Sequence, residues 1–203
     1  MIKSFDEILS KVKSQETKKV AVAVAQDRPV LEAVRDAKEN NIADAILVGN
    51  KGEIEAIAKE IGMDLNKFEI VHEPDVKKAA LKAVELASTG KADMVMKGLV
   101  DTANFLRAVL NKEVGLRTGK LMSHVAVFET EKFDRLLFLT DVAFNMYPEL
   151  KDKVDIINNA ATVARAIGIE RPKVAAVCAV EVVNPNMPET IDASILAKMS
   201  DRG

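Results

Sequence analysis

A short glycine-flanked stretch gathers residue types that bind anions. It reads VGLRTGKLMSHVAVF at residues 114–128, and its candidate side chains and turns are Gly115, Arg117, Thr118, Gly119, Ser123 and His124. Glycine lets backbone N–H groups turn toward an anion, the planar arginine fork matches phosphate oxygens, and hydroxyls add further donors. The stretch therefore predicts a site for a phosphoryl group, although a plain connecting loop has similar composition.

A predicted strand at residues 92–98 ends in a second candidate group. Lys97 leaves this strand as a cation, Gly98 follows without a side chain, and Thr102 begins the next predicted helix. Open α/β sheets bind ligands at the carboxyl ends of their strands, where helix N-termini present unpaired N–H groups. We expect Lys97, Gly98 and Thr102 to face a ligand, but a strand-end lysine also fits a solvated side chain.

Three more positions have both a functional and a structural interpretation. In LLFLTDVAFNMYP, Asp141 ends a strand and Asn145 follows four residues later, which suits either a substrate-orienting acid or an Asx-type turn. Arg28 opposes the dipole of the helix that it begins, so it is a candidate for a cofactor phosphate or else a solvated arginine. His124 fits a base or a hydrogen-bonded structural histidine.

Several familiar kinds of active site are not indicated by the sequence. The two histidines lie far apart, and no Asp, Glu, His or Cys cluster has the spacing of a metal site. No strand is followed by a Gly-x-Gly-x-x-Gly motif, and no P-loop occurs. Cys178 could carry an acyl group, but its place in VAAVCAV predicts an inert buried thiol.

Short apolar strands alternate with amphipathic helices through the first half of the chain. The predicted strands lie at residues 19–25, 43–49, 68–72 and 92–98, and the predicted helices at residues 4–13, 27–40, 51–62, 74–89 and 101–111. Asp27 is a possible N-cap, and Met94 and Met96 are expected to pack in the core. This alternation indicates βαβ units and a largely parallel sheet, so the predicted fold class is α/β.

The pattern changes after Asn111. Two strand-like runs at residues 123–129 and 135–141 are separated only by TEKFD, which predicts an antiparallel hairpin. A helix at 147–169, a strand at 173–180 and a helix at 189–200 follow. We therefore expect an N-terminal α/β domain at residues 1–120 and the first part of a second α/β domain at 121–203, left incomplete because a βαβ series normally continues into another strand.

Composition narrows the functional classes further. Hydrophobic residues make up 48% and charged residues 30% of the 203 residues, as in an ordinary globular protein. The net charge of -2 argues against a general binder of nucleic acid or of membrane surfaces. One cysteine, an N-terminus without a signal-peptide pattern and no run of about 20 apolar residues predict a cytoplasmic protein.

Four segments resemble the phosphate acetyl/butyryltransferase family, above all its clostridial butyryl-transferring members. They are AVAVAQDRPVLEAV, ADMVMKGLVDTANFLRAVLNKEVGLRTGKLMSHVAVFE, LFLTDVAFNMYP and AVEVVNPNMPETIDASILAKM. The resemblance implies reversible transfer of a butanoyl group from CoA to phosphate, with both as substrates and no bound cofactor. It also implies two wound α/β domains with a cleft between them, as in isocitrate and isopropylmalate dehydrogenases, and a homo-oligomer.

The family's chemistry is direct attack in a ternary complex, with an aspartate deprotonating the CoA thiol. The segment with that aspartate matches no position in this chain, so the resemblance implies a C-terminally truncated protein and assigns no catalytic base here. It does imply that Lys97, Gly98, Thr102, the Arg117 turn, Ser123, His124, Asp141 and Asn145 face acyl phosphate and CoA. The alternatives are a non-catalytic fragment that binds CoA or acyl phosphate, and a nicotinamide-dependent 2-hydroxy acid dehydrogenase.

Overall fold

The computed structural model describes residues 2–203, which divide into two compact units. Residues 9–119 form the first, called the sheet unit below, and residues 2–8 with 120–203 form the second, called the hairpin unit. The predicted domains at residues 1–120 and 121–203 stay a prediction. They assign the first residues to the N-terminal domain, whereas residues 2–8 cluster here with residues 120–203.

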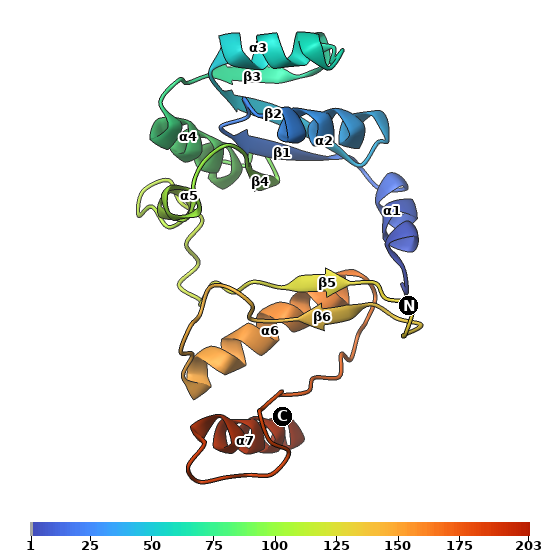
Figure 1. Ribbon diagram of the computed structural model, residues 1–203, viewed down its shortest axis with the longest axis vertical. Helices are drawn as coiled ribbons and strands as arrows, with labels where there is room; N and C mark the ends of the chain where they lie inside the picture. Colours follow the sequence, from blue (N-terminus) through green and yellow to red (C-terminus); the bar gives the residue numbers. More distant parts are fainter. Residues whose placement is uncertain (1) are drawn as a thin grey trace. The chain divides into compact units, whose positions relative to one another are not determined.

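The sheet unit contains a four-stranded parallel sheet, as the alternating pattern predicted. Its strands are β1 (Lys18–Ala23), β2 (Ala43–Gly49), β3 (Glu69–His72) and β4 (Met94–Lys97). They are ordered β3-β2-β1-β4, and every neighbouring pair is parallel (Figure 1). The α/β class with a parallel sheet is therefore confirmed.

Helices cover both faces of this sheet (Figure 1). The helices of the unit are α2 (Arg28–Glu39), α3 (Lys51–Glu60), α4 (Val76–Ser88) and α5 (Thr102–Val109), with a 3-10 turn η1 (Leu65–Lys67). Val22 and Leu47 pack with α2 and α3, whereas Ala21, Ile46 and Val48 pack with α4. Successive strand residues point to opposite faces, so strands buried on both faces need an unbroken apolar sequence.

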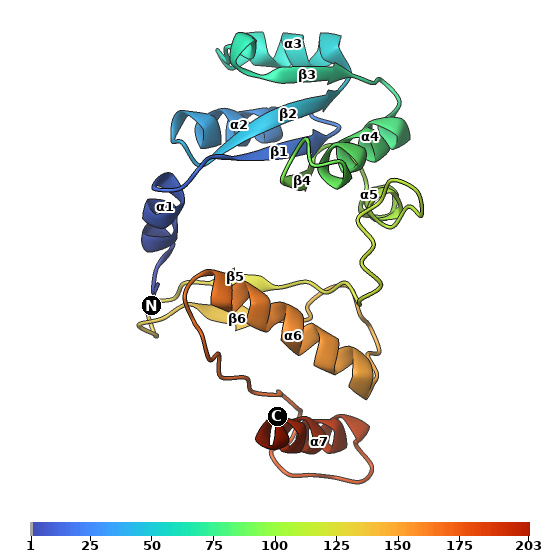
Figure 2. The same cartoon turned by 180° about the vertical axis from the view of Figure 1, so that it is seen from behind.

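The hairpin unit is built on two short strands and two helices. These are β5 (Ala126–Phe128), β6 (Leu137–Leu139), α6 (Leu150–Ala166) and α7 (Pro188–Arg202), and the strands pair antiparallel as predicted. α6 lies along the hairpin in both views (Figures 1 and 2). An ion pair of 2.5 Å between the Lys153 ammonium and the Asp192 carboxylate joins α6 to α7.

The first residues of the chain belong to the hairpin unit rather than to the sheet unit. The Lys3 ammonium lies 2.5 Å from the Asp134 carboxylate, and the Phe5 N–H donates to the Glu129 carboxylate at 2.7 Å. α1 (Phe5–Lys13) starts at these contacts and leads toward β1. Sequence periodicity predicted the helix but not these partners.

The predicted strand at residues 173–180 is wrong. These residues form no regular element, and Val174 and Val177 are 57% and 90% exposed. A strand needs a hydrogen-bonding neighbour, and within residues 120–203 only β5 and β6 pair. Cys178 is consequently half-buried rather than buried, with its Sγ 3.6 Å from the Glu189 carbonyl oxygen.

Two smaller expectations also need correction. Met94 is 47% exposed on β4 and not in the core, because β4 is an edge strand, although Met96 packs against the buried cluster around Leu47. Asp27 occupies the N-cap position of α2, but its side chain makes no capping hydrogen bond. None of the helices within residues 2–203 has the length and apolar character needed to cross a membrane.

Candidate functional site

The carboxyl ends of β1 and β4 lie side by side. The two strands pair from Val20↔Met94 to Ala23↔Lys97, while β2 pairs on the other side of β1. Strand order therefore reverses at β1, and open α/β sheets bind ligands at such a point. Lys97 is exposed at this edge, as its strand-end position predicted, and its contact with a ligand stays a prediction.

Gly98 serves the packing of the two strand-end loops. Its N–H donates to the Ala23 carbonyl at 2.8 Å, and the Leu99 N–H donates to the Val24 carbonyl at 2.8 Å. A Cβ at position 98 would lie 2.3 Å from the Val24 oxygen, which is well inside contact distance. The close approach permitted by this glycine is thus to the protein's own backbone, and Gly98 is buried. Its contact with a ligand stays a prediction.

α5 begins at Thr102, as predicted, but a carboxylate already caps it. Asp101 accepts a hydrogen bond from the Asn104 N–H at 2.9 Å. Hydrogen bonds from the backbone and side chain of Asn104 lower the pKa of Asp101, so this carboxyl stays ionised. A negative charge at the helix N-terminus opposes a second anion there, which leaves the exposed Thr102 hydroxyl as the candidate group.

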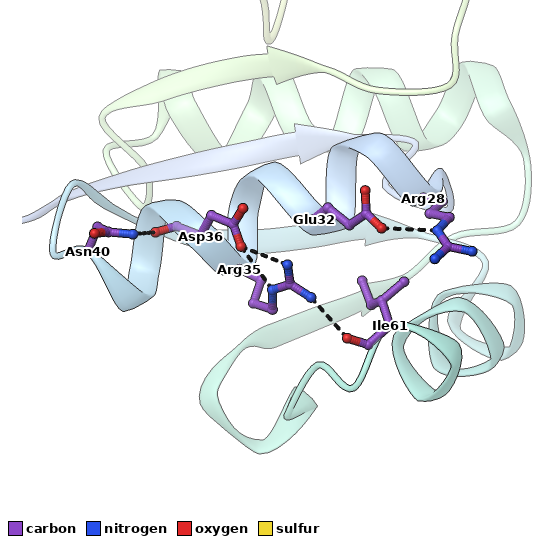
Figure 3. Close-up of polar contacts among 6 residues, drawn as sticks. All are labelled: Arg28, Glu32, Arg35, Asp36, Asn40 and Ile61. Carbon is purple, nitrogen blue, oxygen red and sulfur yellow. Dashed lines mark hydrogen bonds and ion pairs between the residues drawn. The ribbon is translucent and has the colours of Figure 1, made fainter.

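Arg28 has a partner within its own helix. Its Nε donates to the Glu32 carboxylate at 3.0 Å, one turn further along α2 (Figure 3). Both side chains are solvent-exposed, so this pair is weak and exchanges readily for another anion. Contact between Arg28 and a cofactor phosphate stays a prediction.

The glycine-flanked loop leaves the sheet unit with Arg117 exposed. Leu116 is still held to α5, because its N–H donates to the Val109 carbonyl at 2.8 Å. A Cβ on Gly115 would lie 2.3 Å from the Asn111 carbonyl oxygen, and Gly119 has a φ of 79°, where side chains are strained. The two glycines therefore bracket an exposed turn that presents Arg117 and Thr118.

In the hairpin unit, residues 121–124 are held by hydrogen bonds from side chains rather than by backbone pairing with a strand. Thr140 donates its hydroxyl to the His124 carbonyl at 2.8 Å, and Asp141 accepts the His124 N–H at 3.1 Å. The Asn145 amide nitrogen donates to the Met122 carbonyl at 3.0 Å. The structure therefore brings three predicted residues, His124, Asp141 and Asn145, into one hydrogen-bonded cluster.

Asp141 forms the Asx-type turn that was one of its two interpretations. Its carboxylate accepts the N–H groups of Ala143, Phe144 and Asn145 at 3.2, 3.3 and 2.9 Å, and the Asn145 side-chain amide also donates to it. Burial raises the pKa of Asp141, but these hydrogen bonds outweigh burial and leave the pKa below its ordinary value. The ionised carboxylate thus fixes the loop that carries His124.

The His124 ring packs against Phe144, and Nδ1, one of its two nitrogens, has no hydrogen-bond partner within residues 2–203. Its ring meets Phe144 edge-to-face, with centroids 6.0 Å apart and planes at 77°. Nδ1 is buried, and no hydrogen-bond partner for it occurs within residues 2–203. The backbone of His124 rather than its imidazole supplies the structural hydrogen bonds, which leaves the ring nitrogen uncommitted.

Asn159 is a site residue that the sequence reasoning missed. Its amide nitrogen donates to the Leu121 carbonyl at 3.0 Å and to the Ser123 hydroxyl oxygen at 2.9 Å. The sequence did contain an indication of this role, because Asn159 lies on the predicted helix between the apolar positions Ile156 and Val163. A polar side chain near an apolar stripe needs a hydrogen-bond partner, and this expectation alone points to Asn159.

A groove of the sheet unit lies at the opposite end of the strands. It has a volume of about 420 Å³ at the amino ends of the strands, where Thr17, Ala43 and Phe68 line it. Its Lys38 and Asp44 pair at 2.6 Å, so these opposite charges satisfy each other. No cluster of metal-ligating side chains occurs in the part of the chain that the structure describes.

The fold is shared with phosphotransacylases of known structure. The branched-chain phosphotransacylase from Enterococcus faecalis V583 is similar with a TM-score of 0.76 and 29% sequence identity, over 90% of this chain and 64% of that chain. A family model for phosphate acetyl/butaryl transferase matches residues 4–78 and 73–203. The chain belongs to this family, which confirms the resemblance in the sequence.

Two curated relatives are similar over the whole chain. The phosphate butyryltransferase of Clostridium acetobutylicum is 79% identical, and that of Clostridium beijerinckii is 68% identical, each over 203 residues. In both comparisons 100% of this chain aligns with 67% of the relative. The chain therefore spans about two thirds of the length of these relatives.

Proposed function

We propose that the chain is part of a phosphate butyryltransferase, which converts butanoyl-CoA and phosphate reversibly into butanoyl phosphate and CoA. The observation that carries this proposal is 79% identity over all 203 residues to the Clostridium acetobutylicum enzyme of that name. In this reaction CoA and phosphate are substrates, so no resident cofactor is required. A phosphate oxygen forms a bond to the thioester carbon, the C–S bond breaks, and CoA leaves as the thiolate.

The exposed cations and hydroxyls of the site suit this reaction. Phosphate and the developing charge on the acyl oxygen both require fixed hydrogen-bond donors. We assign the phosphate-holding role to Arg117 with Lys97, because both are exposed and the arginine fork matches phosphate geometry. Ser123 supplies a hydroxyl from a loop that Asp141 and Asn145 hold in place.

The remaining predicted positions take supporting roles in this proposal. Thr102, Thr118, Gly119 and His124 contact acyl phosphate or CoA, Gly98 shapes the edge of the sheet, and Arg28 exchanges Glu32 for a CoA phosphate. The two-domain, isocitrate dehydrogenase-like arrangement with a cleft, the ranges 1–120 and 121–203, a homo-oligomeric assembly and a cytoplasmic location are further parts of the proposal, supported by the family resemblance. No residue of this chain is assigned as the base.

Phosphate-dependent release of CoA tests the proposal directly. The chain is incubated with butanoyl-CoA with and without inorganic phosphate, free thiol is measured, and butanoyl phosphate is trapped with hydroxylamine. We expect any thiol release to depend on phosphate and to be matched by acyl phosphate, and robust turnover by these 203 residues would contradict the expectation that the catalytic base lies outside them. Thiol release that ignores phosphate, or NADH formation with a 2-hydroxy acid, would contradict the proposal, while phosphate binding without turnover would favour a binding fragment.

A further inference from the structure

Asn159 uses both of its amide hydrogens on one loop. One nitrogen, Nδ2, lies 3.0 Å from the Leu121 carbonyl oxygen and 2.9 Å from the Ser123 hydroxyl oxygen. The two acceptors are two residues apart, so the amide bridges the backbone on either side of Met122. The Asn145 amide holds Met122 itself, at 3.0 Å from its carbonyl.

The orientation of the Asn159 amide follows from chemistry. A backbone carbonyl oxygen only accepts hydrogen bonds, so the Asn159 atom beside the Leu121 oxygen must be the donating nitrogen. The same nitrogen therefore donates to Ser123 Oγ. The Ser123 hydroxyl thus accepts from Asn159, and its single proton has to be donated elsewhere.

The hydroxyl proton of Ser123 finds no acceptor within the described part of the chain. The hydrogen bond from Asn159 is the one that the structure gives this hydroxyl among residues 2–203. Ser123 is half-buried. A hydroxyl fixed as a donor suits an anionic oxygen and is a poor partner for a cation.

We infer that Asn159 is a positioning residue that holds Ser123 as a hydrogen-bond donor toward an oxygen of phosphate or acyl phosphate. This inference rests on the proposed function and adds the group that sets the direction of the hydrogen bond. Hydrogen bonds to charged groups are stronger than neutral ones, so a hydroxyl that points correctly strengthens anion binding measurably. The Asn159 amide itself does not touch the anion.

A double-mutant cycle tests the inference with inorganic phosphate as the probe. Phosphate is titrated calorimetrically into the 203-residue chain and its Ser123→Ala, Asn159→Ala and doubly substituted variants. Folding of each variant is checked by circular dichroism. We expect each single substitution to weaken binding about tenfold and the double substitution to add little, because both remove the same hydrogen bond. Asn158→Ala is the matched control, since Asn158 is the exposed neighbour on α6, and it should leave binding unchanged.

Asn159→Asp keeps the shape of the side chain and provides a second variant if Asn159→Ala fails to fold. A carboxylate at position 159 would accept the Ser123 proton, so binding should fall more steeply in the presence of Ser123 than in the Ser123→Ala background. In that background only the added charge acts, which separates repulsion from loss of the donor. A purely structural role for Asn159 would give the same loss in both backgrounds.

Three outcomes would overturn the inference. Equal binding by Asn159→Ala and Asn158→Ala would show that Asn159 does not position an anion donor. Additive losses of phosphate affinity in the cycle would show that Asn159 and Ser123 act independently. Unchanged phosphate binding by Ser123→Ala would remove the donor itself. In each case, phosphate-dependent CoA release by the unsubstituted chain would leave the proposed function standing, whereas its absence together with absent phosphate binding would reject both.

Discussion

The two units differ in how deeply their large apolar side chains are buried. The sheet unit contains several that are at most 1% exposed, namely Leu31, Ile46, Leu47 and Ile54. In the hairpin unit, by contrast, the exposed fractions reach 53%, 69% and 90% at Leu139, Val182 and Val177. The sheet unit has helices on both faces of four paired strands. The hairpin unit has two three-residue strands. The buried apolar side chains of residues 120–203 are Leu136, Ile156, Ala161 and Ala164.

This difference shows two ways of fixing a side chain that is proposed to bind a ligand. In the sheet unit, Lys97 is placed by β4, which pairs with the buried strand β1, and Gly98 locks the end of β4 to the end of β1. In the hairpin unit, Ser123 and His124 are placed by polar side chains, because apolar burial there is slight. We therefore expect the sheet unit to depend on packing and the hairpin unit on individual hydrogen bonds.

The largest expected effect is the loss of a core side chain of the sheet unit. Leu47→Ala removes a side chain with 0% exposure and leaves a cavity, which should lower the free energy of unfolding by about 3 kcal/mol. Leu139→Ala on β6 should cost less than about 1 kcal/mol, because that side chain is 53% exposed. Urea unfolding of both variants measures the contrast, and equal losses would show that the hairpin unit is packed as tightly as the sheet unit.

Gly98→Ala should have the next largest effect. The added Cβ would lie 2.3 Å from the Val24 carbonyl oxygen, which is backbone and cannot rotate away. We expect a loss of about 2 kcal/mol in urea unfolding. Gly52→Ala in the first turn of α3 is the control, since its nearest neighbour would be 3.6 Å away, and it should be neutral or slightly stabilising. A neutral Gly98→Ala would mean that the two strand ends are not locked together.

Asp141→Asn should have a smaller, pH-dependent effect on the hairpin unit. The folded-state pKa of Asp141 is lowered, so the ionised carboxyl stabilises the fold fully above its unfolded pKa of about 3.9. That contribution is lost as pH falls through the lower folded pKa. We expect the variant to lose about 1 kcal/mol at neutral pH and to unfold with a flatter pH dependence below about pH 4.

Thermal unfolding followed from neutral to acidic pH measures this effect. Asp155→Asn on α6 is a suitable control, because it removes a carboxylate from the same unit without touching the loop. If Asp141→Asn kept the full acid sensitivity of the unsubstituted chain, the hydrogen bonds to Asp141 would not be what fixes the loop.

The sequence predicted the strands of the sheet unit better than those of the hairpin unit, again because apolar burial differs between the two units. Residues 19–25 and 43–49 were recognisable as buried strands because both faces are apolar, and their burial confirms this. The run at 173–180 has the same apolar composition but finds no neighbouring strand within residues 120–203, so composition alone misassigned it. Strand formation depends on pairing, which no single segment encodes.

The candidate site shows the same limit. Strand-end reasoning proposed Lys97, Asp141 and Asn145, because loops after strands are where polar groups gather. It did not find Asn159, whose partners Leu121 and Ser123 lie more than 30 residues earlier in the chain. It also gave no sign that position 98 requires glycine because of the nearby backbone oxygens of Ala23 and Val24. Such contacts depend on tertiary structure and not on local pattern.

The central claim of the proposal is that the exposed Arg117 turn holds phosphate. Two-dimensional NMR of the ¹⁵N-labelled chain, titrated with inorganic phosphate, tests it most directly. Amide shifts should concentrate at residues 117–119, and the phosphate affinity that they report should fall about tenfold in Arg117→Ala. Arg171→Ala, which replaces an exposed arginine of the hairpin unit, should leave that affinity unchanged. Shifts centred instead on the groove at Thr17, Ala43 and Phe68, or equal behaviour of the two arginine variants, would contradict the claim.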